Sequence, residues 1–266
     1  MLRLVLDSLW DWAWGEDEVG DSSSEEEEEV EAPPRKRIRR MQGEEEVMDF
    51  ALNPSLPQTD VLARGFGAEL TRENLRRLRV EGWLDDEIIN FEMNLLQQQV
   101  EQSGVLCLST FFYTKLTEGN RVRFDLVENW KCNGKKISLN AHRQVLIPVY
   151  LATEKHWVLV EIDLLARELF LLDSMAKEGG GGQVVLENLG QWAERQTGWR
   201  FTLFRAKCQQ QSNGSDCGVF VIAFAWQHLT GAAAIDTHAW RRRILLDLVR
   251  YNEEEEGEED SSEEDG

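Results

Sequence analysis

A cysteine behind a polar, turn-forming stretch is the residue of this chain best suited to covalent chemistry. Cys217 follows the polar stretch 209–216 and begins an apolar run that predicts a helix over about 217–229. At the N-terminus of such a helix, unpaired N–H groups and the helix dipole stabilise a thiolate, and Asp216 or Ser215 is expected to cap the helix. The local pattern fits a buried structural cysteine equally well, because free cysteines are commonly buried.

A histidine and an aspartate flank two neighbouring predicted strands. His156 precedes the apolar run 157–162, and Asp173 follows the apolar run 169–172. If a tight hairpin joins these strands, the start of one lies beside the end of the other, and the two side chains become neighbours. A carboxylate that holds one imidazole nitrogen leaves the other free to accept a thiol proton. Taken singly, the two residues fit a loop histidine and a strand-end turn, and only together with Cys217 do they indicate nucleophilic chemistry.

Two residues close to Cys217 extend this hypothesis. Gln211 stands six positions before the cysteine, and its side-chain amide, together with the Cys217 backbone N–H, is suited to donate to a developing oxyanion. The alternative is a solvated glutamine in the glutamine run 209–211. Gly218 is expected to let a substrate backbone approach the sulfur closely, since it has no side chain.

The elements that must position these residues alternate between helical and strand patterns. Within 85–102, apolar residues from Ile89 to Val100 recur at spacings of four, three and four, which places them on one face of a helix. The predicted helices are 71–78 with Thr71 as N-cap, 85–102, 184–195, 217–229 and 239–251, and the predicted strands are 145–150, 157–162, 169–172 and 199–204. Grouped strands with helices before and after them predict an α+β fold.

The charge of the chain is concentrated at its two ends. The formal net charge is −20 over 266 residues. Residues 1–50 contain 16 acidic and 6 basic side chains, and residues 253–266 contain 10 acidic side chains and no basic one. The middle is neutral, which argues against a nucleic-acid partner, because a surface that follows phosphates requires a basic excess. No run approaches the roughly 18 consecutive apolar residues of a membrane-spanning helix, so no membrane partner is expected.

The cysteines give no sign of a metal site. The chain has four, Cys107, Cys132, Cys208 and Cys217, and no two of them form a CxxC pair. Neither a zinc site nor a disulfide framework is therefore expected, and no cofactor is predicted. A reducing, intracellular compartment fits this pattern best.

A compact basic cluster, Arg35–Arg40, follows two prolines near the N-terminus. Five of its six residues are basic, which indicates a nuclear-import signal, with an import receptor as partner and the nucleus, or also the cytoplasm, as location. The alternatives are a patch for another anionic partner, or charge that only offsets the neighbouring acidic run. Because the run 22–29 repels itself and has no apolar residue to bury, and the tail 253–266 is acidic, we expect disorder over 1–57 and 253–266.

Six segments of the middle region match known motifs in a fixed order. They are Trp83–Phe91 (WLDDEIINF), Thr110–Leu116 (TFFYTKL), Leu146–Val149 (LIPV), His156-Trp157, Asp173-Ser174 and Gln210–Phe220 (QQSNGSDCGVF). With these segments, roughly residues 60 to 250 resemble the SUMO/sentrin-specific proteases, the Ulp/SENP cysteine peptidases. The resemblance implies a papain-like α+β fold with a central mixed sheet flanked by helices, and assigns 58–252 to a protease domain.

The resemblance also implies an activity and roles for seven residues. A thiol protease and isopeptidase would cleave after the C-terminal Gly-Gly of SUMO, release SUMO from target lysines and process its precursor. The implied catalytic residues are His156, Asp173 and Cys217, with Gln211 completing the oxyanion hole, and the implied substrate-binding residues are Trp83, Asp86 and Trp157. The two indoles are expected to clamp the flat Gly-Gly tail, although core packing is the alternative for both, and Asp86 is expected to pair with a basic residue of SUMO.

The expected partners are SUMO and SUMO-conjugated proteins, and we expect a monomer. Two alternatives stay open: the same chemistry on another ubiquitin-like modifier, or a catalytically idle SUMO-binding adaptor. The sequence departs from the family at Gln209, where a proline is usual, and this predicts a less rigid loop around Gln211.

Overall fold

The computed structural model describes residues 33–118, 121–132, 134–175, 181–231 and 234–251. The helices are α1 Pro34–Arg40, α2 Glu44–Ala51, α3 Arg72–Leu75, α4 Asp86–Gln99, α5 Phe111–Leu116, α6 Phe124–Val127, α7 Gly182–Thr197, α8 Cys217–Thr230 and α9 Thr237–Arg250, with short 3₁₀ turns η1 Arg76–Leu78 and η2 Leu139–Ala141. The strands are β1 Val61–Gly65, β2 Ala68–Thr71, β3 Val105–Cys107, β4 Lys131–Cys132, β5 Lys135–Lys136, β6 Gln144–Leu151, β7 His156–Asp163, β8 Glu168–Leu172 and β9 Thr202–Arg205.

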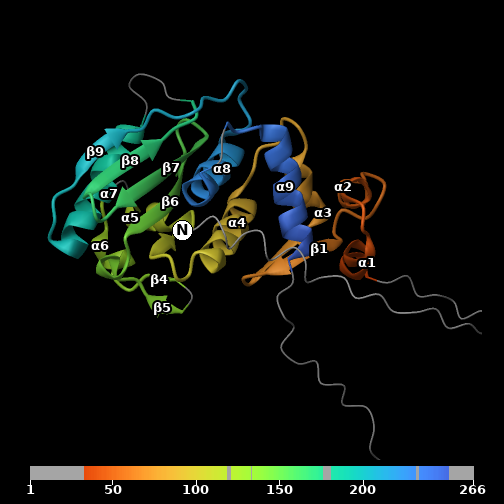
Figure 1. Ribbon diagram of the computed structural model, residues 1–266, viewed down its shortest axis with the longest axis horizontal. Helices are drawn as coiled ribbons and strands as arrows, with labels where there is room; N and C mark the ends of the chain where they lie inside the picture. The colour runs from red at the N-terminus through yellow and green to blue at the C-terminus, as the bar shows by residue number, and fades with distance from the viewer. Residues whose placement is uncertain (1–32, 119–120, 133, 176–180, 232–233, 252–266) are drawn as a thin grey trace, which may run out of the picture. The chain divides into compact units, whose positions relative to one another are not determined.

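A five-stranded mixed sheet forms the centre of the fold, in the order β3-β6-β7-β8-β9 (Figure 1). The strands β6, β7 and β8 are antiparallel to one another, while β3 and β9 pair in parallel fashion at the two edges. The central strands are almost wholly buried because helices cover both faces, as their near-continuous apolar sequences require. This sheet and its flanking helices confirm the predicted α+β class.

Alternate residues of β7 pack into two separate cores. Leu159 points to the face covered by α4 and α8, whereas Val158 and Val160 point to the face covered by α5 and α7. The side of α4 and α8 also packs against α9, so the apolar helix that begins at Cys217 lies between the sheet and the C-terminal helix. The nucleophile candidate is therefore held at the end of a helix buried on several sides.

Most predicted elements are present, with ends displaced by a few residues. Thr71 caps α3 in a reciprocal arrangement with Asn74, and Asp85 caps α4 by accepting from the backbone N–H of Ile88 at 3.2 Å. The predicted helix 85–102 ends earlier, at Gln99, and the predicted strand 199–204 begins only at Thr202. The short elements β1–β5, α5 and α6 were not predicted, because such brief segments do not show a periodicity.

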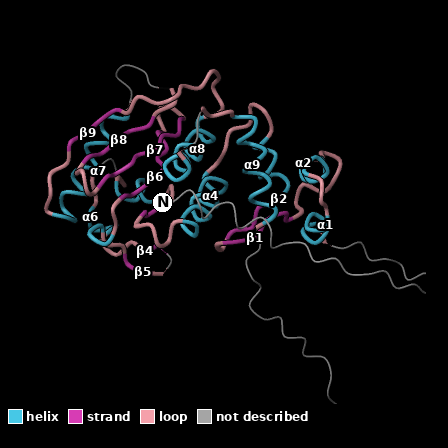
Figure 2. The backbone as a smooth tube through the Cα atoms, in the orientation of Figure 1, coloured by secondary structure: helices cyan, strands magenta, loops and turns pink. Residues whose placement is uncertain are grey.

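The expected disorder up to residue 57 is wrong for two N-terminal helices. α1 and α2 pack against α9 and β1, at one side of the molecule in Figure 2. Ile38, Val47 and Phe50 are buried in the core, and the Arg37 guanidinium lies 4.8 Å from the centre of the Phe50 ring. A few well-spaced apolar residues therefore anchor a highly charged segment, and the folded domain begins before residue 58. Residues 1–32 and 252–266 lie outside the described residues. Within the described ranges, no helix combines the length and apolarity needed to cross a membrane.

Candidate active site

The β7–β8 hairpin brings His156 and Asp173 together. His156 begins β7, Asp173 follows the last residue of β8, and the antiparallel register pairs Leu159 with Leu172. The Nε2 atom of His156 lies 2.7 Å from Oδ1 of Asp173, and both side chains are buried. The backbone N–H of Met175 donates to the same carboxylate oxygen at 2.9 Å. The predicted neighbourhood of the two residues is thus present at the expected sheet edge.

The electrostatics of this pair favour a charged imidazole beside a charged carboxylate. Burial lowers the pKa of His156, but interactions with Asp173 and Cys217 outweigh it and raise the pKa to about 9. Burial also raises the pKa of Asp173, yet the hydrogen bonds from His156 and from the Met175 N–H hold it below its usual range. The Nδ1 atom of His156 is buried and makes no hydrogen bond with the described residues, so this nitrogen is available to the thiol of Cys217.

Cys217 is the first residue of α8 and is buried. Its position leaves the N–H groups of the first helical turn without partners inside the helix. The predicted cap is wrong: Asp216 occupies the N-cap position, but its side chain makes no capping bond and instead forms an ion pair with Arg241, at 2.6 Å. The charge of Asp216 is therefore neutralised from α9, outside the helix that it precedes.

The expected role of Gly218 also needs correction. A Cβ atom at this position would lie 2.8 Å from Cβ of Leu84, which is closer than real side-chain atoms approach. The space beside the glycine is thus occupied by Leu84 and is not left open for a substrate backbone. The glycine allows α8 to pack tightly against the segment that carries Trp83.

Gln211 is tied directly to the end of β8. Its backbone N–H donates to the carbonyl of Ser174 at 2.8 Å, and the Ser174 hydroxyl donates to Oε1 of Gln211 at 2.7 Å. The side-chain amide donates to the Asn213 carbonyl at 2.6 Å, which leaves its second N–H for another acceptor. The glutamine therefore has a fixed orientation in the loop that leads to Cys217.

The loss of proline at position 209 is compensated by side-chain bonds. Nε2 of Gln209 donates to the Ile235 carbonyl at 2.8 Å, and the Ile235 N–H donates to Oε1 at 2.7 Å. Next to it, Nε2 of Gln210 donates to the Asp173 carbonyl at 2.9 Å. The prediction of a looser loop is therefore wrong, because three hydrogen bonds replace the rigidity of the missing ring.

The two tryptophans have different environments. Trp157 is 8% exposed, its indole N–H donates to the Leu84 carbonyl at 3.1 Å, and its ring centre lies 4.8 Å from that of Tyr150. Trp83 is 46% exposed. Asp86, in the first turn of α4, is half-buried and makes no ion pair within the described part of the chain. Trp83 and Asp86 are thus the predicted substrate-binding residues that are most open to a partner.

Two residues that sequence reasoning missed lie against this site. Tyr150 is an exposed aromatic paired across the strands with Trp157. Arg241 is buried beside Asp216. In the sequence it belongs to a run of three arginines, a composition that predicts exposed positions. The exposed aromatic at a strand end was a usable signal for Tyr150, whereas no local signal distinguishes Arg241 from its neighbours.

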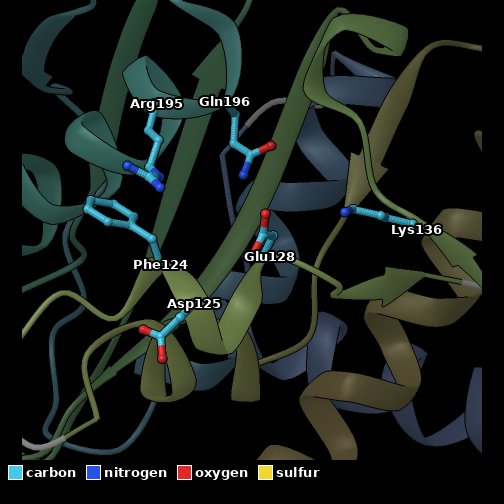
Figure 3. A pocket seen from close by; sticks show the side chains of 6 residues that line it. All are labelled: Phe124, Asp125, Glu128, Lys136, Arg195 and Gln196. Carbon is cyan, nitrogen blue, oxygen red and sulfur yellow. The ribbon is translucent and has the colours of Figure 1, made fainter.

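A separate pocket of about 460 Å³ lies away from these residues, between α6, α7 and β5 (Figure 3). It is lined by Phe124, Asp125, Glu128, Lys136, Arg195 and Gln196. The Arg195 guanidinium lies 5.0 Å from the centre of the Phe124 ring. None of the predicted site residues lines this pocket. Among the described residues, no group of three or more histidine, cysteine or carboxylate side chains is arranged to hold a metal ion.

Residues 82–237 match the Ulp1 protease family, C-terminal catalytic domain. Because this match covers more than half of its length, the chain belongs to the Ulp1 protease family. Sentrin-specific protease 2 of Homo sapiens is 33% identical over 181 residues, which cover 64% of this chain and 29% of the relative. Ubiquitin-like-specific protease 1 of Saccharomyces cerevisiae is 28% identical over 158 residues, which cover 58% of this chain and 24% of the relative.

The fold is shared with a solved structure of the C-terminal Ulp1 protease domain, determined in complex with Smt3, the yeast orthologue of SUMO. The TM-score is 0.65 at 23% identity, over 83% of this chain and 95% of the other. The chain spans about a third or less of the length of the curated relatives that it matches.

Proposed function

We propose that this chain is a cysteine isopeptidase that cleaves after the C-terminal Gly-Gly of SUMO, both in conjugates with target lysines and in the SUMO precursor. The observation that carries the proposal is the buried contact of His156 with Asp173 beside Cys217, with Nδ1 of the imidazole unpartnered within the described residues. Support for SUMO as the modifier comes from the family and from the names of the relatives.

The reaction begins with transfer of the thiol proton. Nδ1 of His156 takes up this proton before the substrate is attacked, because the raised pKa of the imidazole favours its charged form, while Asp173 holds the opposite nitrogen and stabilises the imidazolium. The sulfur attacks the carbonyl carbon of the second glycine, and the developing oxyanion accepts from the Cys217 N–H and the free amide hydrogen of Gln211. His156 then protonates the leaving amine, and a thioester forms.

Hydrolysis of the thioester completes the cycle. His156 removes a proton from water, the hydroxyl attacks the thioester carbonyl, and the thiol of Cys217 is restored as the carboxylate of SUMO leaves. Trp157, anchored by Leu84, and the exposed Trp83 are suited to flank the thin glycine tail, and bulkier tails would be excluded.

The decisive experiment is active-site labelling with electrophile-tipped modifiers. We expect the SUMO probe to label Cys217 faster than matched ubiquitin or other ubiquitin-like probes, with the labelled residue mapped by mass spectrometry. A Cys217→Ala variant is expected to bind a SUMO–peptide conjugate and to release nothing from it. Preferential labelling by another modifier would replace SUMO as the substrate, and full release by the variant would refute the proposed chemistry.

We further propose that α1 directs the protein to the nucleus through an import receptor. Lys36, Arg39 and Arg40 are exposed on this helix, whereas Ile38 anchors it to the core. Alanine at the three exposed positions, with Ile38 retained, is expected to reduce the nuclear fraction of a fluorescent fusion. The exposed Arg64, Arg76 and Lys131, changed to alanine, give a matched loss of three basic charges elsewhere. An unchanged nuclear fraction in the α1 variant would contradict this assignment.

A further inference from the structure

Arg241 of α9 makes an unusually complete set of contacts for an arginine that lies outside the predicted site. The residue is 4% exposed. Its Nε and Nη2 atoms donate to Oδ1 of Asp216 at 3.2 and 2.6 Å. Nη1 donates to the carbonyls of Arg77 and Arg79 at 2.9 and 3.0 Å, and Nη2 also donates to the Gly82 carbonyl at 2.7 Å. All five N–H donors of the guanidinium are therefore used, which a lysine could not reproduce.

Three of these acceptors belong to one tight turn. The carbonyls of Arg77, Arg79 and Gly82 converge on the guanidinium, and the Gly82 N–H donates to the Arg79 carbonyl at 2.9 Å. A Cβ at Gly82 would lie 2.2 Å from the Arg77 carbonyl oxygen, so only glycine permits this turn. Arg241 thus satisfies the carbonyl oxygens that the turn brings together.

The same turn continues into the segment that separates the two catalytic elements. Leu84 contacts Gly218 on one side and accepts from the Trp157 indole on the other, at 3.1 Å. Gly218 follows Cys217, and Trp157 follows His156. Leu84 therefore lies between the start of α8 and the start of β7, and Arg241 joins the turn that precedes Leu84 to the residue that precedes Cys217.

We propose that Arg241 is a positioning residue, which sets the placement of Cys217 relative to His156 by holding Asp216 and the turn 77–82 in one fixed arrangement. The inference rests on the proposed function of Cys217 as nucleophile, but it concerns a residue that touches neither the substrate nor the reacting atoms. Burial raises the pKa of Asp216, and the hydrogen bonds from Arg241 and other neighbours more than offset this and lower it. The ion pair is thus intact at neutral pH, and the second oxygen of Asp216 accepts from Asn213 at 2.9 Å.

The test compares Arg241→Lys with Arg242→Lys in the full chain. Arg242 is its neighbour on α9, but it lies at the surface, where it pairs with Glu44 at 2.9 Å and with Glu45. For each variant, the rate of Cys217 alkylation by iodoacetamide is measured from pH 5 to pH 10, and kcat and KM are measured on a SUMO–fluorophore conjugate. Near-UV circular dichroism gives the folded fraction at the same temperature.

We expect Arg241→Lys to lower both the alkylation rate at neutral pH and kcat by about 10- to 100-fold per folded molecule, because a small misplacement of reacting groups has effects of this size. Arg242→Lys should stay within twofold of the parent protein. Rates for Arg241→Lys within twofold of the parent, per folded molecule, would overturn the proposal and leave Arg241 with a purely structural role.

A second variant, Asp216→Asn, tests the same proposal if Arg241→Lys does not fold. It keeps an oxygen acceptor for the guanidinium but removes the charge that strengthens the bonds, and we expect about a tenfold fall in the alkylation rate. An unchanged alkylation rate in folded Asp216→Asn would equally overturn the proposal. Because iodoacetamide requires no SUMO, failure of the parent protein to cleave SUMO would refute the proposed substrate without affecting this result.

Discussion

The catalytic and substrate-binding parts of the site differ in how their polar groups are satisfied. His156 and Asp173 are buried and bonded to each other, and Gln211 is bonded to the adjacent Ser174. In contrast, Trp83 is largely exposed, and Asp86 has no ion-pair partner within the described residues. His156, Asp173 and Gln211, which we call the bonded set, are fixed by internal hydrogen bonds before any substrate arrives. Trp83 and Asp86, which we call the open set, remain accessible to a binding partner.

This difference predicts a separation of kinetic effects. A change in the bonded set alters the geometry of the reaction and should lower kcat, whereas a change in the open set removes binding that is present throughout the reaction and should raise KM. The four experiments that follow test this separation.

Asp173→Asn should have the largest effect. Loss of the carboxylate removes the orientation and charge that support the His156 imidazolium, and we expect kcat to fall by about 10⁴-fold. Because Asp173 contributes to raising the pKa of His156 to about 9, the imidazolium of the variant should lose its proton at lower pH. Since the imidazolium must protonate the leaving amine, the alkaline limb of the pH profile of kcat/KM should move towards neutral pH.

The matched control is Asp163→Asn, at the far end of β7, where the carboxylate accepts from the N–H groups of Leu165 and Ala166. It should leave kcat and the pH profile of kcat/KM unchanged. An alkaline limb that stays in place in Asp173→Asn would show that the carboxylate does not govern the imidazole.

Glu92→Gln tests whether burial of an ionisable group is by itself important for catalysis. Glu92 is buried in α4, its carboxylate accepts from the Trp226 indole at 3.2 Å, and burial together with Asp247 raises its pKa to about 8, from an ordinary value of 4.5. The folded protein therefore holds this proton more tightly than the unfolded chain, and its free energy of unfolding falls as pH rises from 4.5 to about 8.

Glutamine cannot ionise and has no such pH dependence, so the variant should be more stable than the parent at pH 8 by about 4 kcal/mol, with no difference at pH 4. Urea unfolding at both pH values measures this, and Glu101→Gln, at an exposed position just beyond the end of α4, serves as control. The kcat of Glu92→Gln should match that of the parent. A large loss of kcat would mean that a buried group outside the bonded set also supports catalysis.

Trp83→Ala should raise KM for SUMO conjugates by about 30-fold, because exposed aromatic side chains often dominate protein interfaces, and should change kcat only a few-fold. Leu165→Ala, which removes another exposed apolar side chain (79% exposed) at the β7–β8 turn, should change neither constant. Steady-state kinetics on a fluorescent conjugate separate the two constants. A fall confined to kcat would place Trp83 with the bonded set.

Asp86→Asn should have the smallest effect. A single charge pair near the surface contributes about 0.2–1 kcal/mol, so KM should rise by about fivefold or less, and the rise should shrink with added salt. Glu69→Gln, whose carboxylate pairs with Arg64 on the neighbouring strand, is the control. A rise in KM that is independent of ionic strength would contradict charge pairing at Asp86.

The parts that sequence could predict are those set by local patterns. The periodicity of 85–102 located α4, the apolar runs located β6 to β8, and the hairpin argument placed His156 beside Asp173. Each of these inferences depends on residues that are close in sequence or joined by one turn. The approach of Cys217 to that pair depends on tertiary packing, and the spacing of residues alone could not establish it.

The failures all involve partners that are distant in sequence. Asp216 was expected to cap α8 because its local position suits that role, but Arg241 competes successfully for its carboxylate. The prediction of a looser loop at Gln209 missed the bonds to Ile235, because that residue lies in the segment after α8. The prediction of disorder over α1 and α2 missed the contribution of Ile38 and Phe50, which depends on the packing of these helices against α9 and β1.

The close approach at Gly82 has a consequence for how this protein can tolerate substitution. Any side chain at position 82 would collide with the Arg77 carbonyl, and relief of that collision would displace an acceptor of Arg241. In a saturation library selected for activity, position 82 should accept almost no replacement, whereas Gly214, which has open space around it and no left-handed φ, should accept several. A residue without a side chain, far from the nucleophile in the chain, thereby limits the natural variation of the whole catalytic centre.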